Sequence, residues 1–181
     1  MSIRNVSSAA SNVYKRHMDF PAVSDALKNF TGVQRRFEIL HQSDSLTIVD
    51  DYGHHPAEIQ ATLETAKTVW PNRRLVVVFQ PHRFSRTQHL LESFYSSFND
   101  ADQLVLLDIY AAGEKSIEGI HSRKIAQGVR EFGHKHVDHL ESIDSVIPHL
   151  KNSLQPGDVV LTLGAGNIGE LAHKLAAQFH D

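Results

Sequence analysis

Residues 56–87, PAEIQATLETAKTVWPNRRLVVVFQPHRFSRT, decide the fold. Pro56–Val69 carries apolar residues at helical spacing, and Leu75–Phe79 is a continuous apolar run rich in valine. A strand without polar positions is typical of a parallel sheet that helices cover on both faces. A loop rich in histidine and arginine then leads into the next expected helix, Ser85–Phe98. The stretch therefore predicts a helix–strand–helix unit of an α/β protein.

The same alternation continues on either side of this unit. Before it, strands Gln34–Leu40 and Ser45–Asp50 flank a polar turn, His41–Asp44, and predict a hairpin. Helices are expected earlier still, at Asn5–His17 and Pro21–Phe30. After it we expect strand Leu104–Asp108, helix Ser122–Phe132, strand Val137–Leu140, helix Ile143–Leu154 interrupted by Pro148, strand Val159–Leu163 and helix Ile168–Phe179. The pattern predicts a mostly parallel sheet with helices on both faces, and a domain seam near residue 41.

Composition narrows the classes of function. The chain has 181 residues and a formal net charge of -3, so we do not expect it to bind nucleic acid through a broad basic surface. It has no cysteine, which excludes disulfides and thiolate chemistry and fits a reducing cytoplasm. No apolar run is long enough to cross a bilayer, so no membrane partner is expected.

Polar loops follow four of the predicted strands. Ligands of open parallel sheets bind beyond the carboxyl ends of the strands, so these loops predict one binding site. Arg83 and Arg86 suit a carboxylate or phosphate, although they could also form a solvated helix start. Asp51 could accept from ribose hydroxyls, hold a metal or cap a helix; His54 and His55 could be ligands, polar contacts or caps. The loops are Asp51–Pro56, Gln80–Arg86, Ile109–Glu114 and Gly164–Gly169.

Two further motifs invite other interpretations. Gly164, Gly166 and Gly169 spell the G-x-G-x-x-G fingerprint of dinucleotide binding, but no strand follows it. We therefore expect a tight turn whose backbone N–H groups face an anionic ligand, with a nicotinamide-dependent oxidoreductase as a weaker alternative. The segment 134–139, H-x-H-x-x-H, could bind zinc, but without a completing carboxylate or cysteine an exposed histidine-rich edge is favoured.

The loops resemble those of the Mur ligases, in particular the members that use L-alanine. The matching segments are FTGVQRRFE at 30–38, DDYGHHPAEI at 50–59, VFQPHRFSRT at 78–87, LDIYAAGE at 107–114 and TLGAGNIG at 162–169. The resemblance covers the chain from residue 18 onward. It implies a three-domain ligase of peptidoglycan synthesis, in which ATP and Mg²⁺ activate UDP-N-acetylmuramate as an acyl phosphate that L-alanine then attacks.

The resemblance also implies how the chain is divided and what it lacks. Residues 1–40 would be the end of the central ATP-binding domain, and residues 41–181 the whole third, Rossmann-like domain. The chain contains no G-x-x-x-x-G-K-[ST] loop, so we expect the isolated chain to be inactive. The alternative is a stand-alone ligand-binding or regulatory module that kept the fold and lost catalysis.

Individual residues match the family's functional positions. Three match residues at ATP: Asn5 near the adenine, Arg36 at the nucleotide and Asp51 at the ribose. The residues that would receive L-alanine and the reacting phosphate are Tyr52, His54, His82, Arg83 and Arg86. Of these, the expected catalytic residues are His82, Arg83 and Arg86. The resemblance is weakest at residues 5–17, which are polar where the family has an alanine-rich helix.

Overall fold

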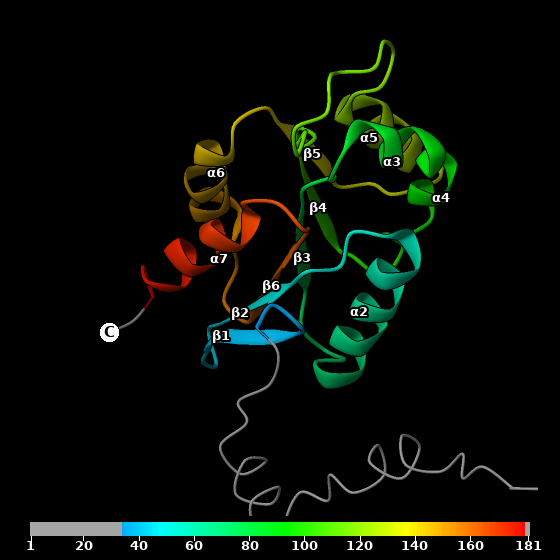
Figure 1. The fold of residues 1–181 in the computed structure, drawn as a ribbon. Helices are drawn as coiled ribbons and strands as arrows, with labels where there is room; N and C mark the ends of the chain where they lie inside the picture. The colour runs from blue at the N-terminus through cyan, green and yellow to red at the C-terminus, as the bar shows by residue number, and fades with distance from the viewer. Residues whose placement is uncertain (1–33, 180–181) are drawn as a thin grey trace, which may run out of the picture. The chain divides into compact units, whose positions relative to one another are not determined.

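The computed structural model describes residues 34–179, which form a six-stranded sheet flanked by helices (Figure 1). The strands are β1 (Glu38–Gln42), β2 (Leu46–Asp51), β3 (Leu75–Phe79), β4 (Gln103–Leu107), β5 (Val137–Leu140) and β6 (Asp158–Leu163). The helices are α2 (Pro56–Val69), α3 (Phe84–His89), α4 (Leu91–Tyr95), α5 (Ser122–Glu131), the short 3-10 helix η1 (Ile143–Ser145), α6 (Val146–Ser153) and α7 (Ile168–Ala176).

The strand order is β1-β2-β6-β3-β4-β5. Strands β1 and β2 form the predicted antiparallel hairpin, and every other neighbouring pair is parallel. The last strand, β6, lies between β2 and β3, where Leu163 pairs with both Asp51 and Phe79. The prediction of a mostly parallel α/β sheet is confirmed.

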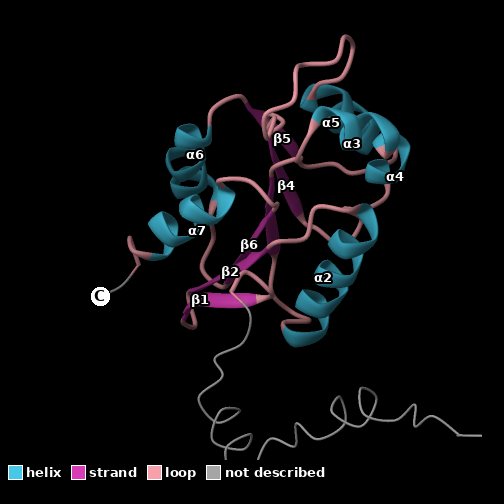
Figure 2. Ribbon diagram, viewed as in Figure 1, coloured by secondary structure: helices cyan, strands magenta, loops and turns pink. Residues whose placement is uncertain are grey.

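Helices cover both faces of the sheet (Figure 2). Helices α2, α3, α4 and α5 lie on one side, and α6 and α7 on the other. Successive side chains of β3 alternate between two cores: Val77 and Phe79 join the first, Val76 and Val78 the second. All four are fully buried. The uninterrupted apolar run of β3 thus reflects burial on both faces.

The start of α2 is capped by its own sequence. The His55 side chain accepts from the backbone N–H of Ala57, and Pro56 occupies the first turn, where its missing N–H is not needed. Glu58 accepts from the backbone N–H groups of His54 and His55. Burial opposes ionisation of Glu58, but these hydrogen bonds, together with the charges of His54 and Arg36, lower the pKa of the carboxyl. Of the roles considered for His55, the structure supports the cap.

Two predicted helices differ from the structure. The expected helix Ser85–Phe98 is divided into α3 and α4, because Leu90 leaves the helical conformation at φ -112° and ψ 12°. The expected helix Ile143–Leu154 is not interrupted by Pro148. It begins as η1 and becomes α6 at Val146, so Pro148 lies in the first turn, where proline is tolerated.

The hairpin belongs to the same sheet as the parallel strands. The compact unit begins at Gln34, and β1 includes residues 38–40, so the predicted seam near residue 41 falls inside the hairpin. The assignment of residues 1–40 to a preceding domain stays a prediction. The expected helices Asn5–His17 and Pro21–Phe30 lie outside the described residues. Among residues 34–179, no helix has the length and apolar character needed to cross a membrane.

The packing of α2 predicts a contrast between two positions of one helix. Ile59 is fully buried in the first core, whereas Val69 is 51% exposed. Ile59→Ala should lower the free energy of unfolding by about 2–5 kcal/mol, because it leaves a cavity. Val69→Ala should change it by no more than about 0.5 kcal/mol. Chemical denaturation of both variants measures the difference; equal values would contradict this assignment of the core.

Candidate functional site

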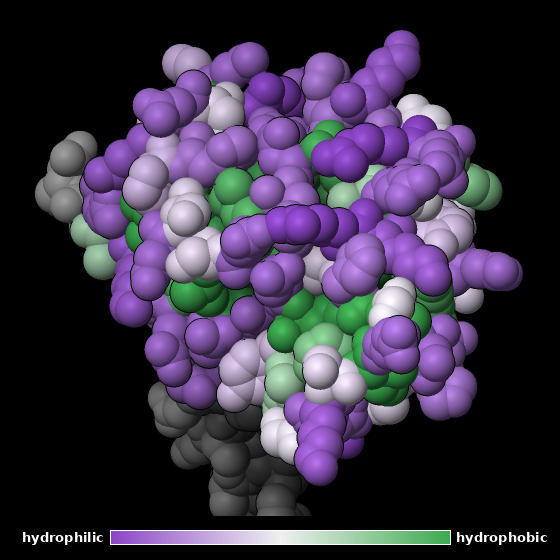
Figure 3. Space-filling view, turned by 90° about the horizontal axis from the view of Figure 1, so that it is seen from above, coloured by the Kyte–Doolittle hydropathy of each residue, from purple (hydrophilic) through white to green (hydrophobic). Residues whose placement is uncertain are grey.

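The polar loops converge at the carboxyl edge of the sheet, as predicted. Pairing continues beyond the strand ends: the backbone N–H of Gln80 donates to the carbonyl of Leu163, and that of Gly164 to the carbonyl of Asp51. His82 and Tyr110 form an isolated parallel bridge. The loop between β4 and α5 rises at the top of Figure 1. Viewed from that side, the surface is mostly hydrophilic with apolar patches (Figure 3).

Four rings form a continuous row across this edge. The ring centroids of Tyr52 and His54 are 5.4 Å apart, those of His54 and His82 are 5.8 Å apart, and those of His82 and Tyr110 are 5.7 Å apart. The structure therefore brings together the predicted residues Tyr52, His54 and His82, and adds Tyr110 beside them. Sequence reasoning had placed Tyr110 in one of the four loops but gave it no role.

His82 is held in one tautomer by Arg86. A guanidinium only donates, so Arg86 Nη1, 3.1 Å from His82 Nδ1, makes that nitrogen the acceptor. A neutral ring then carries its proton on Nε2. Burial lowers the pKa of His82, and the charges of Arg86, His54 and Arg83 lower it further. His82 is therefore suited to donate a hydrogen bond from Nε2 rather than to act as a cation.

Arg83 has a strained backbone conformation and an exposed side chain. It precedes α3 with φ 73°, an uncommon conformation that costs on the order of 1–3 kcal/mol. Its backbone N–H donates to the carbonyl of Tyr110, which fixes the conformation. The exposed guanidinium has no hydrogen-bond partner within residues 34–179. Nε and Nη2 of Arg86 are likewise without partners in this range.

Glu114 connects the loop between β4 and α5 to the start of α3. Its carboxylate accepts from the backbone N–H of Ser85 at 3.0 Å and from Ser85 Oγ at 2.6 Å. These hydrogen bonds, the one from Ser85 Oγ first, lower the pKa of Glu114. Arg83 and Arg86 flank Ser85, so this contact braces the segment that carries both arginines. No sequence motif distinguished Glu114 from its neighbours in the loop.

The three residues predicted to contact ATP differ in their surroundings. Arg36 is exposed, with its guanidinium 5.7 Å from the centroid of the Tyr52 ring. Asp51 is only 7% exposed, and its two carboxylate oxygens accept from the backbone N–H groups of Gly53 and Phe37, both at 2.7 Å. A ribose hydroxyl would have to share an oxygen that already organises the chain. Asn5 lies outside the described residues.

The glycine turn is bonded to a cationic side chain of the chain itself. The carbonyls of Gly164 and Gly166 accept from Arg35 at 2.5 Å and 3.4 Å. Nearby, Gln80 donates to Asn167 Oδ1, while Gln80 Oε1 is buried without a hydrogen-bond partner among the described residues. Arg35 therefore bonds to the carbonyl groups of the turn, while the expectation that its backbone N–H groups face an anionic ligand stays a prediction.

The histidines of the 134–139 segment have separate partners. His134 Nε2 lies 2.9 Å from the carbonyl of Ala101, and His139 Nε2 lies 2.8 Å from Asp108 Oδ1. Across residues 34–179, no group of three His, Cys, Asp or Glu side chains could hold a metal ion. The described structure gives the zinc interpretation no support.

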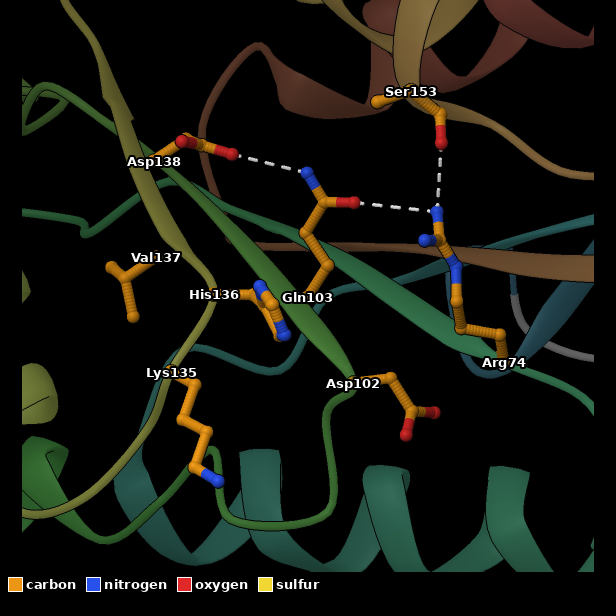
Figure 4. A pocket seen from close by; sticks show the side chains of 8 residues that line it. All are labelled: Arg74, Asp102, Gln103, Lys135, His136, Val137, Asp138 and Ser153. Atoms are coloured by element: carbon orange, nitrogen blue, oxygen red, sulfur yellow. Dashed lines mark hydrogen bonds between the residues drawn. The ribbon is translucent and has the colours of Figure 1, made fainter.

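The opposite edge of the sheet contains a polar hollow of about 460 Å³ (Figure 4). Its wall is a chain of hydrogen bonds in which Arg74 donates to Gln103 and to the Ser153 carbonyl, and Gln103 donates to Asp138. Arg74 also forms an ion pair with buried Asp158. These polar groups brace the starts of the strands by bonding to one another, and they do not converge on the hollow as a ligand set.

The fold defines an α/β domain whose polar loops meet at the carboxyl edge of a mostly parallel sheet. Residues 35–166 match the family model described as "Mur ligase, glutamate ligase domain". The chain belongs to the Mur ligase family, of which it contains the C-terminal domain.

Several relatives show what the chain is similar to. It is 48% identical over 162 residues to the UDP-N-acetylmuramate–L-alanine ligase of Geobacter sulfurreducens, covering 90% of this chain and 35% of that protein. The corresponding ligase of Syntrophotalea carbinolica is 45% identical over 175 residues, covering 97% and 38%. The crystal structure of the Thermotoga maritima UDP-N-acetylmuramate–alanine ligase superimposes with a TM-score of 0.70 at 29% identity, covering 90% and 34%. The chain thus spans little more than a third of these relatives.

The Arg86–His82 contact predicts a measurable shift in pKa. Arg86→Gln removes a positive charge from His82, so the pKa of His82 should rise toward its ordinary value of about 6.5. In the unchanged chain, the unfolded state takes up this proton first as pH falls below 6.5. The stability contributed by neutral His82 is therefore present above that pH and is lost below it.

The titration of His82 can be followed by NMR in the chain and in its variants. Arg123→Gln is the control, since Arg123 is exposed and pairs with Glu141. It should leave the His82 titration unchanged. An identical pKa for His82 in the Arg86→Gln variant would show that the contact does not persist in solution.

Proposed function

We propose that this chain is the amino-acid-side part of an ATP-dependent ligase that joins L-alanine to UDP-N-acetylmuramate in peptidoglycan synthesis. The observation that carries the proposal is the convergence of Tyr52, His54 and His82 with Arg86 at one sheet edge. These residues are among those that the Mur ligase motifs indicated. The names of the relatives, which are 42–50% identical to this chain, support the same substrate pair. A cytoplasmic location belongs to the proposal, since the reaction uses ATP.

The chemistry asks the protein for positioning and charge neutralisation. The sugar carboxylate attacks the γ-phosphate of ATP to give an acyl phosphate and ADP. The amine of L-alanine then attacks the acyl carbon, and phosphate leaves as the amide bond forms. Both steps require that the reactants are aligned and that their negative charges are neutralised. Hydrogen-bond donors held in fixed positions can do both, and the protein then forms no covalent bond to the substrates.

The free donors of Arg83 and Arg86 fit the carboxylate of L-alanine. Arg86 donates from Nη1 to His82. Its Nε and Nη2 remain available to donate in parallel to the two oxygens of a carboxylate. His82 contributes a neutral Nε2–H as a further donor. Because its Nδ1 is occupied, we assign His82 to orientation and hydrogen bonding rather than to removal of the amine proton.

The nucleotide side of the proposal rests on Arg36. Its exposed guanidinium fits a phosphate of ATP. Asp51 would accept from a ribose hydroxyl in addition to the two backbone N–H groups that its carboxylate already binds. Mg²⁺ belongs to the proposed reaction as the partner of ATP. The described residues offer no ligand set for it, so we derive no step through the metal from this domain.

Titration with L-alanine, followed by NMR, tests the substrate site. Shifts should concentrate at Tyr52, His54, His82 and the two arginines. Arg83→Gln should weaken binding by about tenfold or more, because it removes a charged hydrogen-bonding partner worth about 1.5–3 kcal/mol. Arg123→Gln, an exposed arginine outside the site, should bind as the unchanged chain does. Equal affinity in both variants, or shifts confined to other residues, would refute the alanine site.

The isolated chain should not catalyse the ligase reaction. It contains no Walker-type phosphate loop, so Mg-ATP lacks the loop that holds its phosphates in the family. Phosphate release should therefore stay at background when the chain is mixed with ATP, UDP-N-acetylmuramate and L-alanine. Release that depends on all three substrates would contradict this expectation.

A further inference from the structure

Arg35 fills the turn of the G-x-G-x-x-G segment. Its Nη2 and Nη1 donate to the carbonyls of Gly164 and Gly166, and its Nε donates to Asp50 Oδ2 at 2.7 Å. Asp50 is fully buried and also accepts from Thr162 Oγ1 at 2.7 Å. The guanidinium therefore joins the end of β2 to the turn after β6, and Gly164 in that turn is 129 residues away from Arg35 itself in the sequence.

Gly169, the third glycine of the motif, makes room for this side chain. A Cβ at Gly169 would lie 2.5 Å from Arg35 Nε and 2.7 Å from its Cζ. Gly164 adopts φ 145°, which L-residues with side chains rarely take, and its carbonyl points at the guanidinium. In a dinucleotide site the corresponding turn offers N–H groups to a pyrophosphate. Here the missing Cβ of Gly169 leaves space for the guanidinium of Arg35.

The backbone around Arg35 is held in an unfavourable conformation. Arg35 has φ 58° and Phe37 has φ 50°, each costing about 1–2 kcal/mol for an L-residue. Arg35 N donates to Glu38 Oε2, the carbonyl of Arg35 accepts from the N–H of Tyr52, and the N–H of Phe37 donates to Asp51. Every polar group of Arg35 therefore takes part in fixing this bend.

The bend places Arg36 on the open side. Arg35 turns inward to the glycines while Arg36 stays exposed, and both guanidiniums lie within 6 Å of the Tyr52 ring centroid, at 5.2 Å and 5.7 Å. A flexible exposed arginine would lose side-chain entropy on binding a phosphate, and holding it beforehand reduces that cost.

We propose that Arg35 is a positioning residue: seated in the glycine turn, it holds Arg36 over the Tyr52 ring, ready for an anionic group of the ligand. The part of this inference that concerns the ligand rests on the proposed function, in which Arg36 meets a phosphate of ATP. The part that concerns Arg35 is a property of the chain without ligand, so it can be tested separately.

The test is NMR spectroscopy of the ligand-free chain and three variants. Arg35→Gln removes the cation. Gly169→Ala keeps it but displaces it, because the added Cβ occupies the place of Nε; Gly169 lies in α7 without positive φ, where alanine is favoured over glycine. Glu170→Ala is the matched control, since Glu170 is the next residue of α7, is exposed and does not touch Arg35. The readouts are cross-peaks between Arg36 and the Tyr52 ring, and exchange of the Phe37 and Tyr52 amides.

Arg35→Gln and Gly169→Ala should both lose the Arg36–Tyr52 cross-peaks. Their Phe37 and Tyr52 amides should exchange about tenfold faster or more, while amides of β3 and β4 remain protected. Glu170→Ala should match the unchanged chain. If Arg35→Gln does not fold, Gly169→Ala decides alone. Cross-peaks of unchanged intensity in Gly169→Ala would overturn the proposal. Failure to bind L-alanine would instead count against the proposed function.

Discussion

The four central strands have helices packed against both of their faces, and this burial controls where polar chemistry can occur. Within β2, β3, β4 and β6, polar side chains are tolerated only when they are paired. Asp50 is the clearest case: it is fully buried and bonds to Thr162 and Arg35. The other two aspartates of these strands, Asp51 and Asp158, lie where β2 ends and where β6 begins.

The two edges use these groups differently. At the amino edge, Arg74, Gln103 and Asp138 form a chain of hydrogen bonds along the wall of the hollow, so these three side chains already have partners (Figure 4). At the carboxyl edge, the Arg83 guanidinium has no hydrogen-bond partner among the described residues, and its backbone is strained. These two features together favour the carboxyl edge over the amino edge as the candidate ligand site.

Much of this arrangement could be predicted from residue types. The runs Pro56–Val69 and Leu75–Phe79 formed the expected helix and strand with the same bounds. The division between α3 and α4 at Leu90 was not predictable, since Leu90, Leu91 and Phe94 continue a helical apolar pattern across it. The start of α6 was misjudged because a proline does not reveal whether it lies in a first turn or in a helix interior.

The sequence alone was enough to predict the α/β class, the family and the four loops that meet at the carboxyl edge, because hydrophobic period and motif spacing are local properties. Tertiary structure decided which neighbouring residue does what. Adjacent Arg35 and Arg36 look alike in the sequence, yet one fills the glycine turn and the other stays exposed. The difference arises because β6 pairs between β2 and β3, which brings Gly164 beside a chain segment about 130 residues away. Such long-range pairing leaves no trace in local residue patterns.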